Sequence, residues 1–147
     1  MALRFRQVAL LTIILLPMIS LAEIAAVHVE GMWLSADGTG WIKIELSDNG
    51  PIGSIAGSAD KSGNRGPSDK DNLNPDPALR DRLLLGLTIM DGFTYAGGGK
   101  WKSGRIYDPN SGKTYKCKLT LVDKNTLELR GYIGFSLLGR TETWTRQ

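Results

Sequence analysis

The residues that most often carry catalysis are scarce in this chain of 147 residues. His28 is the only histidine and Cys117 is the only cysteine. A Ser-His-Asp triad or a multi-histidine zinc site needs a richer set of side chains, and no histidine lies near Cys117 in the sequence to activate its thiol. Cys117 is therefore interpreted as a small core residue rather than a nucleophile or a metal ligand. We expect no catalytic residue, no metal site and no cofactor.

Carboxylates are the remaining candidates for acid–base chemistry. Glu45, Glu128 and Glu142 lie on expected strands, and Asp108 opens an expected turn. Two carboxyl groups roughly 5–9 Å apart can hydrolyse a glycosidic bond. Each glutamate, however, alternates onto a face that it shares with other polar residues, which favours a solvated outer face. A hydrolase ranks third among our hypotheses and requires two of these four carboxylates to converge in one pocket.

Aromatic residues with basic neighbours could bind a small molecule. Lys100 and Lys102 flank Trp101, and Arg146 follows Trp144 by two residues. Such aromatic faces stack on sugars or on single-stranded nucleic acid, and core packing is the alternative for every tryptophan. The candidate ligand contacts are Trp101, Tyr107, Tyr132, Arg140 and Trp144.

An apolar segment lies between Arg130 and Arg140, and its glycines permit sharp bends. The simpler interpretation is that this segment plugs one end of a barrel. Alternatively, Phe135 and Leu137 form an interaction tip that faces a protein partner or a membrane surface. The large apolar residues of the segment are Ile133, Phe135, Leu137 and Leu138.

Glycine placement and alternating polarity predict an all-β fold. All 18 glycines follow residue 30, and they separate short alternating segments. Strands are expected at 31–34, 40–47, 52–59, 86–90, 100–107, 114–122, 126–132 and 140–146. About eight antiparallel strands with short connections close into an up-and-down barrel, whose interior holds packed side chains or one small ligand.

Two finer expectations follow from the same patterns. The polar segment 57–82 predicts one long loop, in which Asp76 caps a short helix that begins at Pro77. Alternation places Cys117 and Leu119 on the inner face of their strand. In the strand before it, alternation places four residues on one face: Trp101, Ser103, Arg105 and Tyr107.

The first 22 residues have the pattern of a secretory signal peptide. Arg4 and Arg6 precede an apolar run, and Ser20 and Ala22 place small residues at the cleavage position. The run is too short to span a bilayer comfortably, and no cysteine follows it to carry a lipid. We expect cleavage before Glu23, no transmembrane span after cleavage, and a periplasmic or secreted protein.

The remaining chain is expected to be a flexible leader over 23–30 and a single domain over 31–146. The formal net charge of +3 includes Arg4 and Arg6, so the mature chain is nearly neutral. A near-neutral domain lacks the basic surface that nucleic acid requires, and nucleic acid is excluded as an expected partner.

Several segments together resemble a known bacterial family. They are 74–77 (NPDP), 84–87 (LLGL), 104–109 (GRIYDP), 112–117 (GKTYKC) and 130–146 (RGYIGFSLLGRTETWTR). They are similar to the family called domain of unknown function 2147, over residues 31 to 146. The resemblance implies exported proteins of Gram-negative bacteria with a lipocalin-like (calycin) β-barrel and no established activity. Many members have a cysteine pair in the long loop, which this chain lacks, so no loop disulfide or loop metal site carries over.

Three hypotheses for function remain. The first is an exported barrel of uncharacterised function that binds a small, partly apolar ligand. The second is a cell-envelope module that docks on an envelope protein or a membrane through the apolar segment or the long loop. The third is the carboxylate-based hydrolase.

Overall fold

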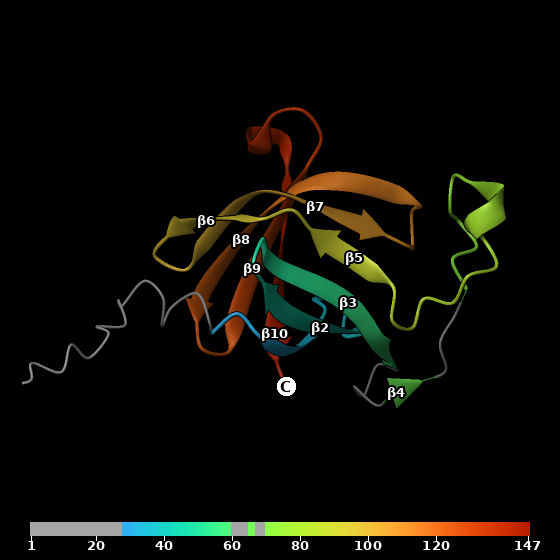
Figure 1. The fold of residues 1–147 in the computed structure, drawn as a ribbon, viewed down its shortest axis with the longest axis horizontal. Helices are drawn as coiled ribbons and strands as arrows, with labels where there is room; N and C mark the ends of the chain where they lie inside the picture. Colours follow the sequence, from blue (N-terminus) through green and yellow to red (C-terminus); the bar gives the residue numbers. More distant parts are fainter. Residues whose placement is uncertain (1–27, 60–64, 67–69) are drawn as a thin grey trace, which may run out of the picture.

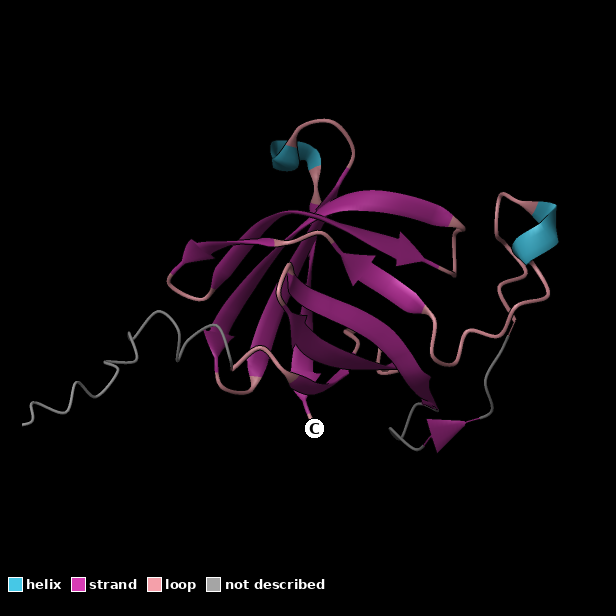
Figure 2. Cartoon of the chain, viewed as in Figure 1, coloured by secondary structure: helices cyan, strands magenta, loops and turns pink. Residues whose placement is uncertain are grey.

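The computed structural model describes residues 28–59, 65–66 and 70–147 of the chain, and strands dominate them (Figures 1 and 2). The strands are β1 (Gly31–Leu34), β2 (Gly40–Ser47), β3 (Gly50–Ala59), β4 (Arg65–Gly66), β5 (Thr88–Asp91), β6 (Thr94–Gly97), β7 (Lys100–Asp108), β8 (Lys113–Asp123), β9 (Thr126–Tyr132) and β10 (Arg140–Arg146). Two 3₁₀ helices are η1 (Pro77–Leu79) and η2 (Ser136–Leu138). No helix in these ranges is long and apolar enough to span a membrane. The expected signal peptide and most of the expected leader lie outside the described residues.

Within the described ranges, eight strands close an antiparallel barrel. The ring runs β1, β2, β3, β5, β7, β8, β9 and β10, and β10 pairs back with β1. The ring follows the order of the chain, with β4 and β6 as side branches, and only the closing pair joins distant strands. The predicted all-β, up-and-down barrel of about eight strands is therefore confirmed. Because side chains alternate along each strand, one face of every strand points into the interior.

Between β3 and β7, the barrel wall consists of two short strands, β5 and β6, in place of one long strand. β5 and β6 both pair with β7, one after the other along its length. Gly92 adopts a φ of 74° between them, and the ring of Phe93 turns into the core. That ring occupies the space that a side chain on Gly104 would fill. The sequence analysis missed β6 because its four residues end in a run of glycines and show little alternation.

A bulge in β7 changes the direction of its side chains. Ser103 adopts a φ of 66°, and the pairing with β8 shifts between Trp101 and Gly104. Trp101 and Gly104 are both buried, whereas Arg105 is exposed. The expectation that Trp101, Ser103, Arg105 and Tyr107 share one face is therefore wrong. A bulge adds one residue to the strand, so Trp101 points inward and Arg105 and Tyr107 point outward.

A tryptophan and an arginine close one end of the barrel. Trp33 on β1 is fully buried, and its Nε1 donates to the carbonyl oxygen of Val29 at 3.0 Å. The Arg146 guanidinium on β10 lies over the Trp33 ring, 4.3 Å from its centroid. The same guanidinium donates to backbone carbonyl oxygens of His28, Glu30 and Lys124. This cluster joins β1, β10 and the turn between β8 and β9.

The segment of residues 70–87, which leads into β5, contacts the barrel at the end of β7. Its turn at η1 is as predicted: the Asp76 carboxylate accepts from the backbone N–H of Ala78 at 2.9 Å, and Pro77 begins the helix.

Asp71 fastens this segment to the barrel. Its fully buried carboxylate accepts a hydrogen bond from the Tyr107 hydroxyl at 2.5 Å. It also accepts from the Asn74 amide at 2.7 Å and from the Arg82 guanidinium at 2.9 Å. Burial opposes ionisation of Asp71, but these hydrogen bonds together hold the pKa of its carboxyl below the ordinary value.

Candidate functional site

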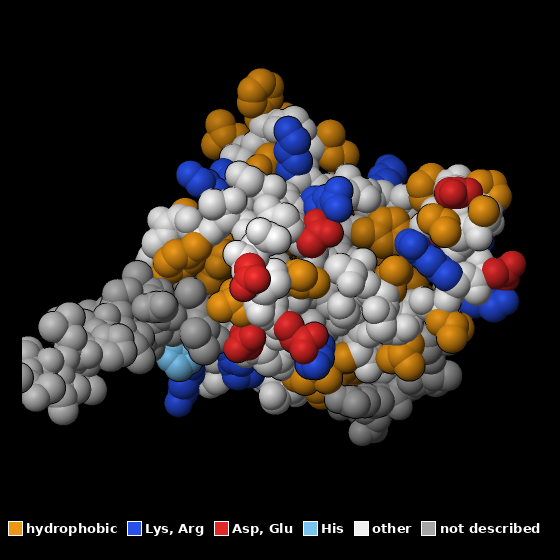
Figure 3. Space-filling model, in the orientation of Figure 1, with side chains coloured by type: hydrophobic (Ala, Val, Ile, Leu, Met, Phe, Trp, Pro, Cys, Tyr) orange, Lys and Arg blue, Asp and Glu red, His pale blue; other side chains and the backbone are white. Residues whose placement is uncertain are grey.

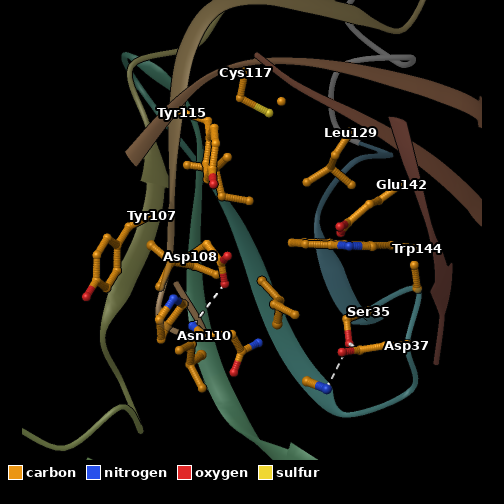
Figure 4. Close-up of a pocket in the computed structure, with 18 of the residues that line it drawn as sticks. Ser35, Asp37, Tyr107, Asp108, Asn110, Tyr115, Cys117, Leu129, Glu142 and Trp144 are labelled. Carbon is orange, nitrogen blue, oxygen red and sulfur yellow. Dashed lines mark hydrogen bonds between the residues drawn. The ribbon is translucent and has the colours of Figure 1, made fainter. Parts of the chain in front are cut away.

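A cavity of about 1310 Å³ occupies the barrel interior (Figure 4). Its rim is formed by the turns that join β1 to β2, β7 to β8 and β9 to β10, so it opens at the end opposite Arg146. Apolar walls come from Ile42, Ile89 and Leu129, and polar side chains lie among them. Clefts with mostly apolar walls and a few placed polar groups are the usual form of a small-molecule site.

Trp144 presents an unsatisfied N–H group at the wall of this cavity. Its side chain on β10 is only 2% exposed, and Nε1 finds no hydrogen-bond acceptor in the part of the chain that the structure describes. A buried donor without an acceptor is destabilising, so such groups commonly have a water or ligand partner. Trp144 therefore remains a candidate ligand contact.

Glu142 lies beside Trp144 on the same inward face of β10 (Figure 4). Its carboxylate makes no hydrogen bond or ion pair with any described residue. Glu142 is exposed to solvent, as expected, but it lines the cavity rather than the outer face, because Trp144 points inward and strand residues two apart share a face. That spacing was visible in the sequence and could have placed Glu142 in the cavity.

The other candidate contacts divide between the cavity and its surroundings. Arg140 lines the cavity near the rim on the same face as Trp144. Tyr132 borders the rim, with the Lys118 ammonium 5.6 Å from its ring centroid. Tyr107 borders the cavity as well, but its ring points away from the interior (Figure 4) and its hydroxyl is bound to Asp71.

Trp101 lies in the core rather than on the cavity lining. Its ring packs against Tyr95, with the two centroids 5.2 Å apart. The β7 bulge turns Trp101 inward near the closed end of the barrel, deeper than the residues that line the cavity. The sequence analysis also missed Tyr115, which lines the cavity on the inward face of β8 that it shares with Cys117.

Cys117 lies at the inner part of the cavity and is fully buried. Burial, with a smaller contribution from the Glu142 charge, raises the pKa of its thiol to about 12. A thiol with this pKa stays protonated at neutral pH and is a poor nucleophile and a poor metal ligand. The interpretation of Cys117 as a buried core residue is confirmed.

The four candidate carboxylates divide between the cavity and the outer surface. Asp108 lines the cavity with Glu142, but both of its oxygens accept hydrogen bonds from its own turn, from the backbone N–H of Asn110 at 3.0 Å and the hydroxyl of Ser111 at 2.6 Å. Glu45 is an exposed partner of Lys43, and Glu128 is exposed on the outer face.

Asp37, at the rim, is a second turn carboxylate. Burial opposes its ionisation, but hydrogen bonds from Ser35 and Thr39 hold the pKa of this carboxyl below the ordinary value. It accepts from the Ser35 hydroxyl at 2.6 Å and from the backbone N–H of Thr39 at 3.0 Å. Among the described residues, no three His, Cys, Asp or Glu side chains gather closely enough to hold a metal ion.

Comparisons with known proteins agree with this geometry. Residues 31–146 match the family described as "Uncharacterized protein conserved in bacteria (DUF2147)". The chain belongs to the DUF2147 family. The resemblance drawn from the sequence motifs is thereby confirmed.

The DUF2147 barrel is also similar to a solved structure described as "Protein HP1028 from the human pathogen Helicobacter pylori belongs to the lipocalin family". The TM-score is 0.72 and the identity 23%, over 80% of this chain and 82% of that chain. A likeness at this identity shows a lipocalin-like fold. No curated protein matches the chain.

The apolar segment of this DUF2147 member does not plug the barrel. Phe135 is 80% exposed and Leu137 is 90% exposed. Ile133 and Leu138 border the cavity rim, yet they are also mostly exposed. The simpler of the two interpretations is wrong, because the loop between β9 and β10 turns outward (Figure 1).

Proposed function

We propose that this protein is an exported, lipocalin-like barrel that binds one small, partly apolar ligand in its cavity. The observation that carries the proposal is the buried, unpartnered Nε1 of Trp144 at the wall of a cavity of about 1310 Å³. Typical small-molecule sites have volumes of about 300–1,000 Å³, so the space is ample. The signal-peptide pattern of residues 1–22 supports export.

The side chains around the cavity indicate the chemistry of the ligand. Trp144 offers a hydrogen-bond donor, so the ligand should carry an acceptor. Glu142 offers a carboxylate without a described partner, so the ligand should also carry a hydroxyl, an amine or another donor. Ile42, Ile89 and Leu129 suit an apolar body. A hydroxylated or aminated amphiphile satisfies all three requirements.

Mass spectrometry of the protein purified from its own cells tests the two parts of this proposal separately. Under native conditions we expect a discrete extra mass that denaturation releases. Under denaturing conditions we expect the mass of a chain that begins at Glu23. A protein that is empty, and that binds none of a panel of amphiphiles, would overturn ligand binding. An uncleaved chain recovered only from the cytoplasm would overturn export.

Matched tryptophan variants test the site. The probe is dodecanol, whose hydroxyl can accept from Trp144 and donate to Glu142, measured by its displacement of the dye N-phenylnaphthylamine. Trp144→Phe keeps most of the ring but removes the donor, so dodecanol should bind about three- to tenfold more weakly. Trp101→Phe removes a buried indole outside the cavity lining and should leave the affinity unchanged. Equal effects of the two variants would show that Trp144 is not a ligand contact.

A further inference from the structure

The loop between β9 and β10 exposes four large apolar side chains. We call the side chains of Ile133, Phe135, Leu137 and Leu138 the apolar tip. Their exposed fractions are 69%, 80%, 90% and 84%. Single exposed apolar residues are ordinary, but a contiguous group of this kind marks an interaction site.

The tip is held in place by its own scaffold. The Arg130 guanidinium donates to the carbonyl oxygens of Ser136 at 2.8 Å and Leu137 at 3.2 Å, and to the Thr141 hydroxyl at 2.9 Å. Gly139 packs so closely that a Cβ there would lie 2.6 Å from the carbonyl oxygen of Gly131. The exposed side chains therefore project from a built turn, η2, rather than from an unsupported loop.

Basic residues of β8, β9 and β10 lie at the base of the tip. Lys118 lies opposite Arg130 in the β8–β9 ladder, Lys116 lies opposite Tyr132, and Arg140 follows the tip on β10. The Lys118 ammonium also reaches the Ser136 hydroxyl at 3.3 Å. No acidic residue occurs between positions 130 and 141 or between 113 and 122. Figure 3 shows the same arrangement: apolar side chains protrude where η2 lies in Figure 1, with Lys and Arg side chains beneath them.

We propose that the apolar tip inserts into the interface of an anionic lipid bilayer, while the lysines and arginines at its base pair with lipid phosphates. An apolar surface of a few large side chains above a ring of cations is the pattern of peripheral membrane proteins. A protein partner is less well matched, because specific protein interfaces bury about 800 Å² on each side, and this tip is a small convex projection.

Docking of this kind places the part of the cavity rim formed by the β9–β10 turn on the membrane. Ile133 and Leu138 belong both to the tip and to the cavity lining. A partly apolar ligand could then pass between bilayer and cavity without crossing open water. The docking proposal itself goes beyond ligand binding and does not depend on it.

Co-sedimentation of the full mature chain with lipid vesicles is the direct test. Vesicles that contain phosphatidylglycerol should carry the protein down, and vesicles of phosphatidylcholine alone should carry much less. Binding to the anionic vesicles should weaken as salt increases, because exposed charge pairs are screened. A protein that stays in the supernatant with anionic vesicles at low salt would overturn the proposal.

Matched variants localise the contact. Phe135→Ser with Leu137→Ser should lower the vesicle partition coefficient at least tenfold, because both apolar anchors are lost. Val122→Ser changes a 54% exposed apolar residue near the opposite end of the barrel and should have no effect.

Lys116→Gln should weaken binding to anionic vesicles about fivefold, whereas Lys102→Gln near the closed end should leave this binding unchanged.

Two further measurements separate the alternatives. Sedimentation velocity without lipid should show a monomer. A different outcome would be a parent protein that forms a dimer and does not bind vesicles, with the dimer lost in the Phe135→Ser, Leu137→Ser variant. That outcome would make the tip an interface between copies of the chain and overturn the proposal. Dodecanol affinity should be the same in the tip variant as in the parent. Loss of vesicle binding with unchanged dodecanol affinity would support docking independently of the cavity.

Discussion

Cys117 and Glu142 line the same cavity but differ in their exposure to solvent. Both point inward, from neighbouring parts of the barrel. The thiol is fully buried, and burial together with the nearby carboxylate charge raises its pKa to about 12. Glu142 keeps contact with solvent through the open cavity and has no described partner. One residue is thus chemically inert, and the other is available to a ligand.

The inertness of Cys117 can be measured with Ellman's reagent. At pH 8 a thiol with a pKa near 12 is about one part in ten thousand thiolate. The native protein should therefore react on the order of a thousandfold more slowly than free cysteine. Unfolding in guanidinium should release one fast-reacting thiol per chain. Rapid labelling of the native protein would contradict the core position of Cys117.

Among the elements, the segment between β4 and β5 depends on a single buried carboxylate. Asp71 accepts from Tyr107 on β7 and from Asn74 and Arg82 within the segment. The Arg82 guanidinium also lies 5.8 Å from the Tyr107 ring centroid. Tyr107, a predicted ligand contact, is therefore better explained as the residue that attaches this segment to the barrel.

Tyr107→Phe should lower the free energy of unfolding by about 1.5–3 kcal/mol, since it removes a hydrogen bond to a buried charge. Tyr115→Phe is the control, because the Tyr115 hydroxyl makes no hydrogen bond with a described residue. Urea unfolding of both variants at neutral pH provides the comparison. Similar losses in the two variants would contradict the role assigned to Tyr107.

The same variant has a predictable pH dependence. The pKa of Asp71 is lower in the folded chain than in the unfolded chain. Its stabilising contribution is therefore complete above the unfolded pKa of about 3.9, and it is lost as the pH falls through the lower, folded pKa. The stability difference between the parent and Tyr107→Phe should shrink over that acidic range.

The element scale also shows what the sequence could and could not predict. Strong alternation between glycines predicted the bounds of β2 and β10 correctly. The direction of β7 side chains was not predictable in this way, because the bulge at Ser103 depends on pairing with β8. Glu142 was assigned to the outer face because it shares that face with polar residues, although its spacing from Trp144 indicated an inward position. The outward turn of the apolar tip depends on Arg130, whose contacts are tertiary.

Seen as a whole molecule, the barrel is closed at one end and open at the other. Arg146 and Trp33 seal the closed end, and Gly31 leaves room for the guanidinium because a Cβ there would collide with it. Burial lowers the pKa of Arg146, and the carbonyl oxygens around it satisfy its donors. The cavity rim and the apolar tip lie at the open end.

Arg146→Lys should lower the stability of the barrel by about 2–3 kcal/mol. A lysine ammonium cannot stack on Trp33 and reach several carbonyl oxygens at once, as the planar guanidinium does. The control is Arg105→Lys, whose ion pair with Asp91 at 2.6 Å is exposed and should contribute little to stability. Thermal unfolding monitored by circular dichroism tests the pair. A loss no larger than that of the control would contradict the sealing role of Arg146.

The joining of β1 to β10 also constrains the order of folding. Arg146 and the Glu30 carbonyl oxygen, 2.5 Å apart in space, are 116 residues apart in the sequence. Contacts of such long range are slow to form, because the chain must lose much of its freedom before they can stabilise it. We therefore expect the meeting of the first and last strands to be the last step of folding. Under the export that we propose, a chain that closes so late would stay unfolded, and therefore able to thread across a membrane, until nearly all of it has passed.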